Sequence, residues 1–120
     1  DKIIQAIHPS PSDHIVEIGP AQGAITQFLV KRCKRLDAIE LDKDLIPKLE
    51  RKFPFDNFHL TQFDALKFDY SLLHDNQGLR IAGNLPYNIS TLIKVITVHL
   101  NCIDPGHAFL YFLTLVIQKK

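Results

Sequence analysis

Cysteine is scarce in this 120-residue chain, which has only Cys33 and Cys102. The two lie far apart and form no Cys-x-x-Cys pair, so the sequence does not support a disulfide framework or a zinc site. The six histidines are scattered and never recur at the spacing of metal ligands. We therefore expect reduced thiols, a cytoplasmic protein and no bound metal.

An excess of charge of one sign is also missing. Lys and Arg number 14 and Asp and Glu number 13, which gives a formal net charge of +1. A balance this close excludes attraction to nucleic acid through bulk charge, so any nucleic-acid partner must be recognised by a specific site. The proportions of hydrophobic (46%) and charged (22%) residues are ordinary for a globular protein and exclude a disordered one.

Long apolar runs are absent as well. The longest, residues 108–117, spans half of the about twenty residues that a membrane helix needs. The N-terminal residues lack the charged and apolar regions of a signal peptide, and Asp1 stands in place of an initiator Met. We therefore expect a trimmed start and no association with a membrane.

Apolar runs alternate with segments of helical periodicity along the whole chain, which is the pattern of successive βαβ units. After a short helix that ends before Pro9, the pattern predicts helices over residues 23–32, 43–52 and 90–100. It predicts strands over residues 15–18, 36–41, 58–63, 79–83 and 109–117. The fold class is therefore α/β, an open doubly wound sheet that binds its ligand at the carboxyl ends of the strands.

The turn after the first strand has the sequence Glu-Ile-Gly-Pro-Ala-Gln-Gly over residues 17–23. Glycine at positions 19 and 23 lets the backbone approach a ligand closely. The spacing differs from the G-x-G-x-x-G pattern of dinucleotide sites, and Glu17 would repel a pyrophosphate but help to hold an ammonium or sulfonium group. The alternative is a tight turn with no ligand.

Acidic residues follow the next two predicted strands. Glu40 lies about 20 residues after Gly19, where doubly wound nucleotide folds place the acid that accepts hydrogen bonds from ribose hydroxyls. Asp64 can accept an adenine amino proton, with the backbone of Ala65 and Leu66 beside the ring. Its alternative role is a cap of a helix or turn. Together these acids outline a pocket for an adenosine with a positively charged substituent.

The segment 83–90, Gly-Asn-Leu-Pro-Tyr-Asn-Ile-Ser, follows the fourth predicted strand. An exocyclic adenine amine is a poor nucleophile, so a catalyst must hold it with acceptors that present its lone pair to the methyl group. Asn84 Oδ1 and the Pro86 carbonyl can do this, and Tyr87 offers a flat face for an unstacked base. An Asn-Pro turn beside a buried tyrosine would explain one or two of these residues but not the whole string.

Four motifs make the chain resemble, over essentially its full length, the adenine-N6 dimethyltransferases of ribosomal RNA. They are Glu-Ile-Gly-Pro at 17–20, Ile-Glu-Leu-Asp at 39–42, Asp-Ala-Leu at 64–66 and Gly-Asn-Leu-Pro-Tyr-Asn-Ile-Ser-Thr at 83–91. Pro20 and Leu85 make the chain more similar to the small-subunit branch, which contains the dimethyladenosine transferase linked to kasugamycin sensitivity. The erythromycin-resistance branch is less similar.

The resemblance implies a Rossmann-like class I methyltransferase, with an open, mainly parallel sheet, helices on both faces and the first five strands in this chain. It implies S-adenosylmethionine as donor and two adjacent adenines in a hairpin near the 3′ end of small-subunit rRNA as substrate. The partner is then the small ribosomal subunit, and we expect a monomer. The implied cofactor-binding residues are Glu17, Gly19, Ala21, Gly23, Glu40, Leu41, Asp64, Ala65 and Asn84. The implied catalytic residues are Asn84, Leu85, Pro86 and Tyr87.

The chain departs from the family pattern in three places. Ala21 stands where a second glycine is usual and adds a methyl group beside the expected cofactor. The family's Gln-Asn-Phe-Leu segment, which helps to cover the cofactor, would precede Asp1. Further strands and a helical RNA-binding domain would follow Lys120. We therefore expect residues 1–120 to be part of an S-adenosylmethionine-dependent methyltransferase domain that is inactive by itself.

Two other functions compete with this prediction. One is a non-catalytic RNA- or ribosome-binding fragment or diverged homologue, which Ala21 favours and the presence of Asn84, Pro86 and Tyr87 disfavours. The other is a DNA adenine or glutamine methyltransferase, whose similar loop usually has an acidic residue or a second proline. The string Asn84-Leu85-Pro86 argues against it.

Overall fold

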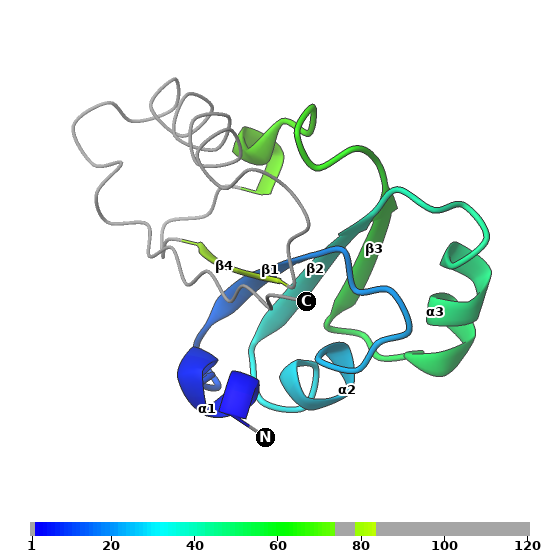
Figure 1. The fold of residues 1–120 in the computed structure, drawn as a ribbon. Coiled ribbons are helices and arrows are strands. Elements are labelled where there is room, and N and C mark those ends of the chain that lie inside the picture. Colours follow the sequence, from blue (N-terminus) through cyan, green and yellow to red (C-terminus); the bar gives the residue numbers. More distant parts are fainter. Residues whose placement is uncertain (1, 74–78, 84–120) are drawn as a thin grey trace.

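A computed structural model describes residues 2–73 and 79–83, which form a parallel sheet covered on both faces (Figure 1). The strands lie in the order β3-β2-β1-β4, and all three neighbouring pairs are parallel. In chain order, the elements are α1 (Lys2–Ile7), β1 (His14–Ile18), α2 (Thr26–Leu29), β2 (Arg35–Glu40), α3 (Ile46–Lys52), β3 (Phe58–Gln62), the 3-10 helix η1 (Tyr70–Leu73) and β4 (Arg80–Gly83).

The strands agree with the sequence prediction to within a residue at each end, but two helices are shorter than predicted. The segment 23–32 has a regular helix only over α2, because Gly23 has a positive φ of 87° and bonds of i−3 spacing, such as Phe28 N to Ile25 O, interrupt the α-helical pattern. The second helix begins at Ile46 and not at Lys43, with proline in its first turn. The predicted helix 90–100 and strand 109–117 lie outside the described residues.

The apolar residues of the strands form two cores, one on each face of the sheet. On one face Ile15 and Leu36 pack with α1, α2 and α3 through Ile7, Leu29 and Leu49. The other core contains Val16, Ile18, Ile39 and Ile81 of the strands, with Ala65 and Phe68 of the segment before η1 and Tyr70, the first residue of η1. Neighbouring residues of one strand therefore face opposite cores, which is why apolar residues stand next to one another in β1, β2 and β4.

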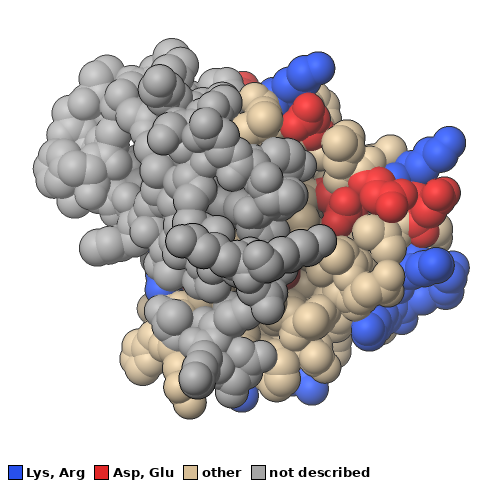
Figure 2. Space-filling model, in the orientation of Figure 1, with Lys and Arg blue, Asp and Glu red and all other residues tan. Residues whose placement is uncertain are grey.

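The described surface has charges of both signs. On the face shown in Figure 2, Asp and Glu side chains lie next to Lys and Arg side chains, in keeping with the near balance of charge in the sequence. Among the described residues, no helix has the length and apolar character to cross a membrane.

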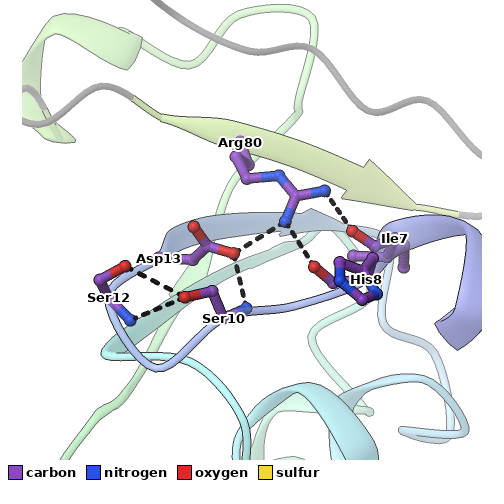
Figure 3. A network of polar contacts seen from close by, with 6 residues as sticks. All are labelled: Ile7, His8, Ser10, Ser12, Asp13 and Arg80. Carbon is purple, nitrogen blue, oxygen red and sulfur yellow. Dashed lines mark hydrogen bonds and ion pairs between the residues drawn. The ribbon is translucent and has the colours of Figure 1, made fainter.

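Arg80 connects the beginning of β4 to the N-terminal part of the chain (Figure 3). Its guanidinium donates hydrogen bonds to the carbonyl oxygens of Ile7 and His8, and it pairs with the Asp13 carboxylate at 2.7 Å. Asp13 also accepts a bond of 2.7 Å from the Ser10 amide. A cation at the last carbonyls of a helix is favourable, so Arg80 ties the end of α1 to the strand that leads to residue 84.

Candidate functional site

The site lies at the edge of the sheet where the parallel strands end. The turn that follows β1 has three residues with positive φ, namely Gly19 (66°), Ala21 (54°) and Gly23 (87°). The Gly19 amide donates to Ile39 O at 2.9 Å, and the Gly23 amide donates to Pro20 O at 2.8 Å. These bonds seat the turn on the end of β2 and close it on itself. Ala21 is the one residue of the three that has a side chain in this unfavourable region.

Glu40, the last residue of β2, reaches this turn. Its Oε1 accepts the Ala21 amide at 3.0 Å, and its Oε2 accepts the Asp42 amide at 3.0 Å. The residue is buried, with 8% of its surface exposed. Because each carboxylate oxygen has two acceptor sites, the two backbone amides fix the orientation of Glu40 and leave acceptor capacity on both oxygens.

Gly19 and Gly23 differ in what surrounds them. A Cβ placed on Gly19 would meet no atom of residues 2–73 and 79–83 within 4 Å, so this part of the chain leaves space beside the backbone there. A Cβ on Gly23 would lie 2.5 Å from Cε2 of Phe53, so the absence of a side chain at Gly23 makes room for that ring. The open side of the turn at Gly19 is the side on which a ligand can approach the backbone closely.

Glu17 lies inside the protein with 1% of its surface exposed. Its Oε1 accepts a hydrogen bond of 2.6 Å from Thr26 Oγ1. Burial raises the pKa of Glu17 from its ordinary value to about 7, the Thr26 bond opposes this shift, and the charge of Glu40 adds to it. The Glu17 carboxyl therefore holds its proton to a higher pH than an exposed glutamate does. Its contact with a cationic ligand group stays a prediction.

Asp64 and Ala65 follow β3 at the same edge of the sheet. Asp64 is half-buried, and its Oδ1 accepts the Leu66 amide at 2.9 Å. It therefore caps a turn, as its alternative interpretation proposed, and its contact with adenine stays a prediction. Ala65 is buried, and its carbonyl accepts a bond of 2.8 Å from the Tyr70 hydroxyl. Leu41, after β2, is 55% exposed.

The predicted catalytic residues Asn84, Leu85, Pro86 and Tyr87 lie outside the described residues. The strand that leads to them ends at Gly83, which pairs with Ile18 of β1. A Cβ on Gly83 would be 2.5 Å from the Ile18 carbonyl oxygen, so only glycine permits this close approach. The described chain therefore reaches residue 83 beside the beginning of the 19–23 turn.

Three residues that contact Glu17 or the 19–23 turn were not predicted from the sequence. They are Thr26, Lys52 and Phe53. Thr26 binds Glu17 from α2, and Phe53 fills the space beside Gly23. The sequence signal at Phe53 indicated only the end of a helix before Pro54.

Among the described residues, no group of three or more His, Cys, Asp or Glu side chains has an arrangement that could hold a metal ion.

The whole chain, residues 1–120, matches the protein family described as "Ribosomal RNA adenine dimethylase". It belongs to that family. The α/β fold is accordingly that of a Rossmann-like class I methyltransferase, and the predicted fold class is confirmed. The small-subunit branch indicated by Pro20 and Leu85 agrees with the names of the similar proteins described next.

Two curated relatives are named "Ribosomal RNA small subunit methyltransferase A". The one from Coxiella burnetii is 43% identical over 111 residues, which is 91% of this chain and 43% of the relative. The one from Pseudomonas syringae pv. syringae is 55% identical over 93 residues, 76% of this chain and 35% of the relative. A solved dimethyladenosine transferase from Plasmodium falciparum superimposes with a TM-score of 0.71 at 26% identity, over 99% of this chain and 40% of its own. The chain thus spans less than half the length of each.

Proposed function

We propose that this segment is the cofactor-binding part of an enzyme that methylates N6 of two adjacent adenines in small-subunit rRNA, with S-adenosylmethionine as donor. The observation that carries the proposal is the contact between the buried Glu40 carboxylate and the Ala21 amide at the ends of neighbouring strands. This contact aims a preoriented acceptor at the turn after β1, where class I methyltransferases bind their donor.

The described residues fit this donor. Open space at Gly19 gives its adenosine part access to the backbone, and Glu40 has acceptor capacity for two ribose hydroxyls. Asp64 has one carboxylate oxygen for the adenine amino group. When bound, S-adenosylmethionine supplies a methyl group on a sulfonium. Burial raises the pKa of the Glu17 carboxyl to about 7. When this carboxyl is ionised, its negative charge favours the sulfonium cation.

The residues after Gly83 handle the target base in this proposal. Asn84 and the Pro86 carbonyl accept hydrogen bonds from the adenine amine and present its lone pair, Leu85 joins them, and Tyr87 stacks on the ring. The amine becomes acidic only after methylation, so no strong general base is needed at the start. Preorganised acceptors at the reacting nitrogen therefore provide the main catalytic effect.

The small ribosomal subunit is the proposed partner, and the protein acts on it as a cytoplasmic monomer without a metal. Acidic and basic side chains are interspersed on the described surface in Figure 2. This surface therefore offers little single-sign charge for phosphates, and we assign most of the RNA affinity to chain outside this segment. The relatives, which are more than twice as long as the parts that match, have room for such a domain.

A non-catalytic ribosome-binding protein is the second candidate, and Ala21 is the observation that favours it. Its positive φ of 54° strains a non-glycine residue at the point where the donor would lie. An active enzyme would need to bind its donor in spite of this strain. A binding module would not need the donor at all.

The deciding experiment uses a protein that carries this segment at the length of its relatives, here called the full-length protein. It is incubated with labelled S-adenosylmethionine and small ribosomal subunits that lack the two dimethyladenines. The rRNA is then digested and its nucleosides are separated. We expect N6,N6-dimethyladenosine, and subunits that are already dimethylated serve as the control. If the full-length protein binds the subunits but forms no methylated adenosine, the binding module is the correct function.

A further inference from the structure

The unit formed by β2 and α3 contacts three consecutive residues of the 19–23 turn. Glu40, at the end of β2, accepts the Ala21 amide at 3.0 Å. Lys52, at the end of α3, donates a hydrogen bond of 2.8 Å from Nζ to the Gln22 carbonyl. The next residue, Phe53, occupies the space that a Cβ on Gly23 would require. The turn is therefore held from the ends of two different elements.

The contacts from α3 come from a firmly held position. Phe53 is 5% exposed and belongs to the same core as Leu29 and Leu49. Its amide donates to Leu49 O at 3.0 Å, and its ring meets Phe58 edge-on at a centroid distance of 5.6 Å. The ammonium of Lys52 lies 5.9 Å from the centre of the Phe53 ring. Phe53 cannot move without disturbing the core, so it fixes the position of the backbone at Gly23.

The turn needs such support because its conformation is unfavourable by itself. Ala21 has a φ of 54°, and an L-residue in this region persists when its surroundings hold it there. The Glu40 contact depends on this conformation, since it uses the Ala21 amide. Lys52 and Phe53 hold the two residues that follow Ala21.

We infer that Lys52 and Phe53 are positioning residues for donor binding. They hold residues 21–23 in the conformation in which the Ala21 amide meets Glu40, and they raise the affinity for S-adenosylmethionine without contacting it. The inference rests on the proposed function, because it assumes that this turn binds the donor. It adds a second requirement, that α3 determines the geometry of the turn.

The test compares variants that disturb the turn with matched variants that do not. Lys52→Met removes the bond to Gln22, and Lys48→Met removes another exposed lysine of the same helix. Phe53→Leu loosens the contact with Gly23, and Phe58→Leu disturbs the same aromatic pair away from the turn. Lys52→Arg retains a cationic donor and serves as the rescue variant.

Affinity for S-adenosylmethionine is measured by titration calorimetry on the full-length protein, at a temperature at which circular dichroism shows every variant folded. We expect Lys52→Met and Phe53→Leu to weaken binding by about threefold to tenfold. Lys48→Met and Lys52→Arg should bind like the wild type. Phe58→Leu should lower the melting temperature and weaken the affinity less than Phe53→Leu does, because it loosens the support of Phe53 and keeps the contact of Phe53 with Gly23. Without ligand, hydrogen exchange at the amides of residues 21–23 should be faster in Lys52→Met than in Lys48→Met.

Two results would overturn the inference, and they differ in meaning. If the wild type binds the donor while Lys52→Met and Phe53→Leu match their controls in affinity and in hydrogen exchange, α3 does not position the turn and the proposed function stands. If the wild type does not bind S-adenosylmethionine at all, the proposed function is wrong and this role is wrong with it.

Discussion

Thr26 of α2 donates a hydrogen bond of 2.6 Å to Glu17 of β1, and both residues are buried. The bond favours the ionised carboxyl, but burial disfavours it more, and the pKa of Glu17 rises to about 7. The folded protein therefore binds a proton at Glu17 in a pH range in which the unfolded chain has released it. This difference links stability to pH.

The first prediction concerns this linkage. Because the pKa of Glu17 is higher in the folded state, its stabilising contribution is complete below pH 4.5 and is lost as the pH rises to about 7. The loss amounts to about 3 kcal/mol, from the free energy equivalent of a pKa difference. Glu17→Gln should remove it. Urea unfolding of both proteins at pH 4.5, 6 and 7.5 measures the effect.

The titration of Asp37 does not overlap with that of Glu17. Burial raises its pKa, but hydrogen bonds from His14 and Arg35 outweigh burial and lower it below the ordinary value, so Asp37 titrates at more acidic pH. Glu50→Gln, at an exposed position of α3, serves as the control. Parallel stability curves for the wild type and Glu17→Gln would contradict the assignment of a raised pKa to Glu17.

Ala21→Gly should stabilise the protein by about 0.5–1 kcal/mol. The change relieves the cost of a left-handed alanine, about 1–2 kcal/mol, and returns part of the gain through the greater entropy of an unfolded glycine. The control is Ala24→Gly in the same turn region, where no positive φ occurs and the substitution should not stabilise. Thermal unfolding measures both. A lower melting temperature for Ala21→Gly would show that the alanine is not strained.

Arg80→Met should destabilise the protein more than Asp13→Asn does. Arg80 loses its bonds to the Ile7 and His8 carbonyls as well as its pair with Asp13, whereas Asp13→Asn weakens only the pair and the Ser10 bond. We expect about 1–3 kcal/mol for Arg80→Met, and a coupling energy of about 0.5–3 kcal/mol in the double-mutant cycle. Urea unfolding gives these values, and strictly additive effects would show that the two side chains do not interact.

Glu40→Ala in the full-length protein should weaken binding of S-adenosylmethionine about tenfold or more, since each charge-assisted bond to a ribose hydroxyl is worth about 1.5–3 kcal/mol. Titration calorimetry measures the affinity. Asp44→Ala is the control, because Asp44 is an exposed acidic residue on the loop after β2, outside the predicted cofactor-binding set. Equal affinities of Glu40→Ala and the wild type would remove Glu40 from the cofactor site.

Asn84→Ala should leave donor binding nearly intact, since the other cofactor-binding residues remain, and lose about 10²–10³ in turnover, the usual effect of removing one preorganised group at a reacting centre. Tyr87→Ala should cost about 1–3 kcal/mol of base stacking, while Tyr87→Phe keeps the ring and most of the activity. Methyl incorporation into unmodified small subunits measures turnover. A fully active Asn84→Ala protein would show that the adenine amine is positioned by other groups.

The class of fold, and the edge of the sheet at which the site lies, can be predicted from the amino-acid sequence. Three of the four described strands contain adjacent apolar residues, such as Ile15 and Val16 in β1, because strands with a core on each face need apolar side chains on both. Glu40 and Gly19 can then be placed at neighbouring strand ends, since parallel strands end at one edge. The motif at 83–91 is specific enough to indicate the family.

The contacts of each site residue depend on the tertiary structure. Sequence spacing places Glu17 beside the turn, but its burial under Thr26 and its raised pKa depend on how α2 packs on the sheet. The sequence pattern predicts that Gly23 lets the backbone approach a ligand closely. In the structure, the absence of a side chain at Gly23 makes room for Phe53, which is distant in sequence. Asp13 and Arg80 are 67 residues apart. The sequence of one segment determines its own conformational preferences. These contacts form between segments that are distant in the sequence, so they cannot be predicted from any one segment alone.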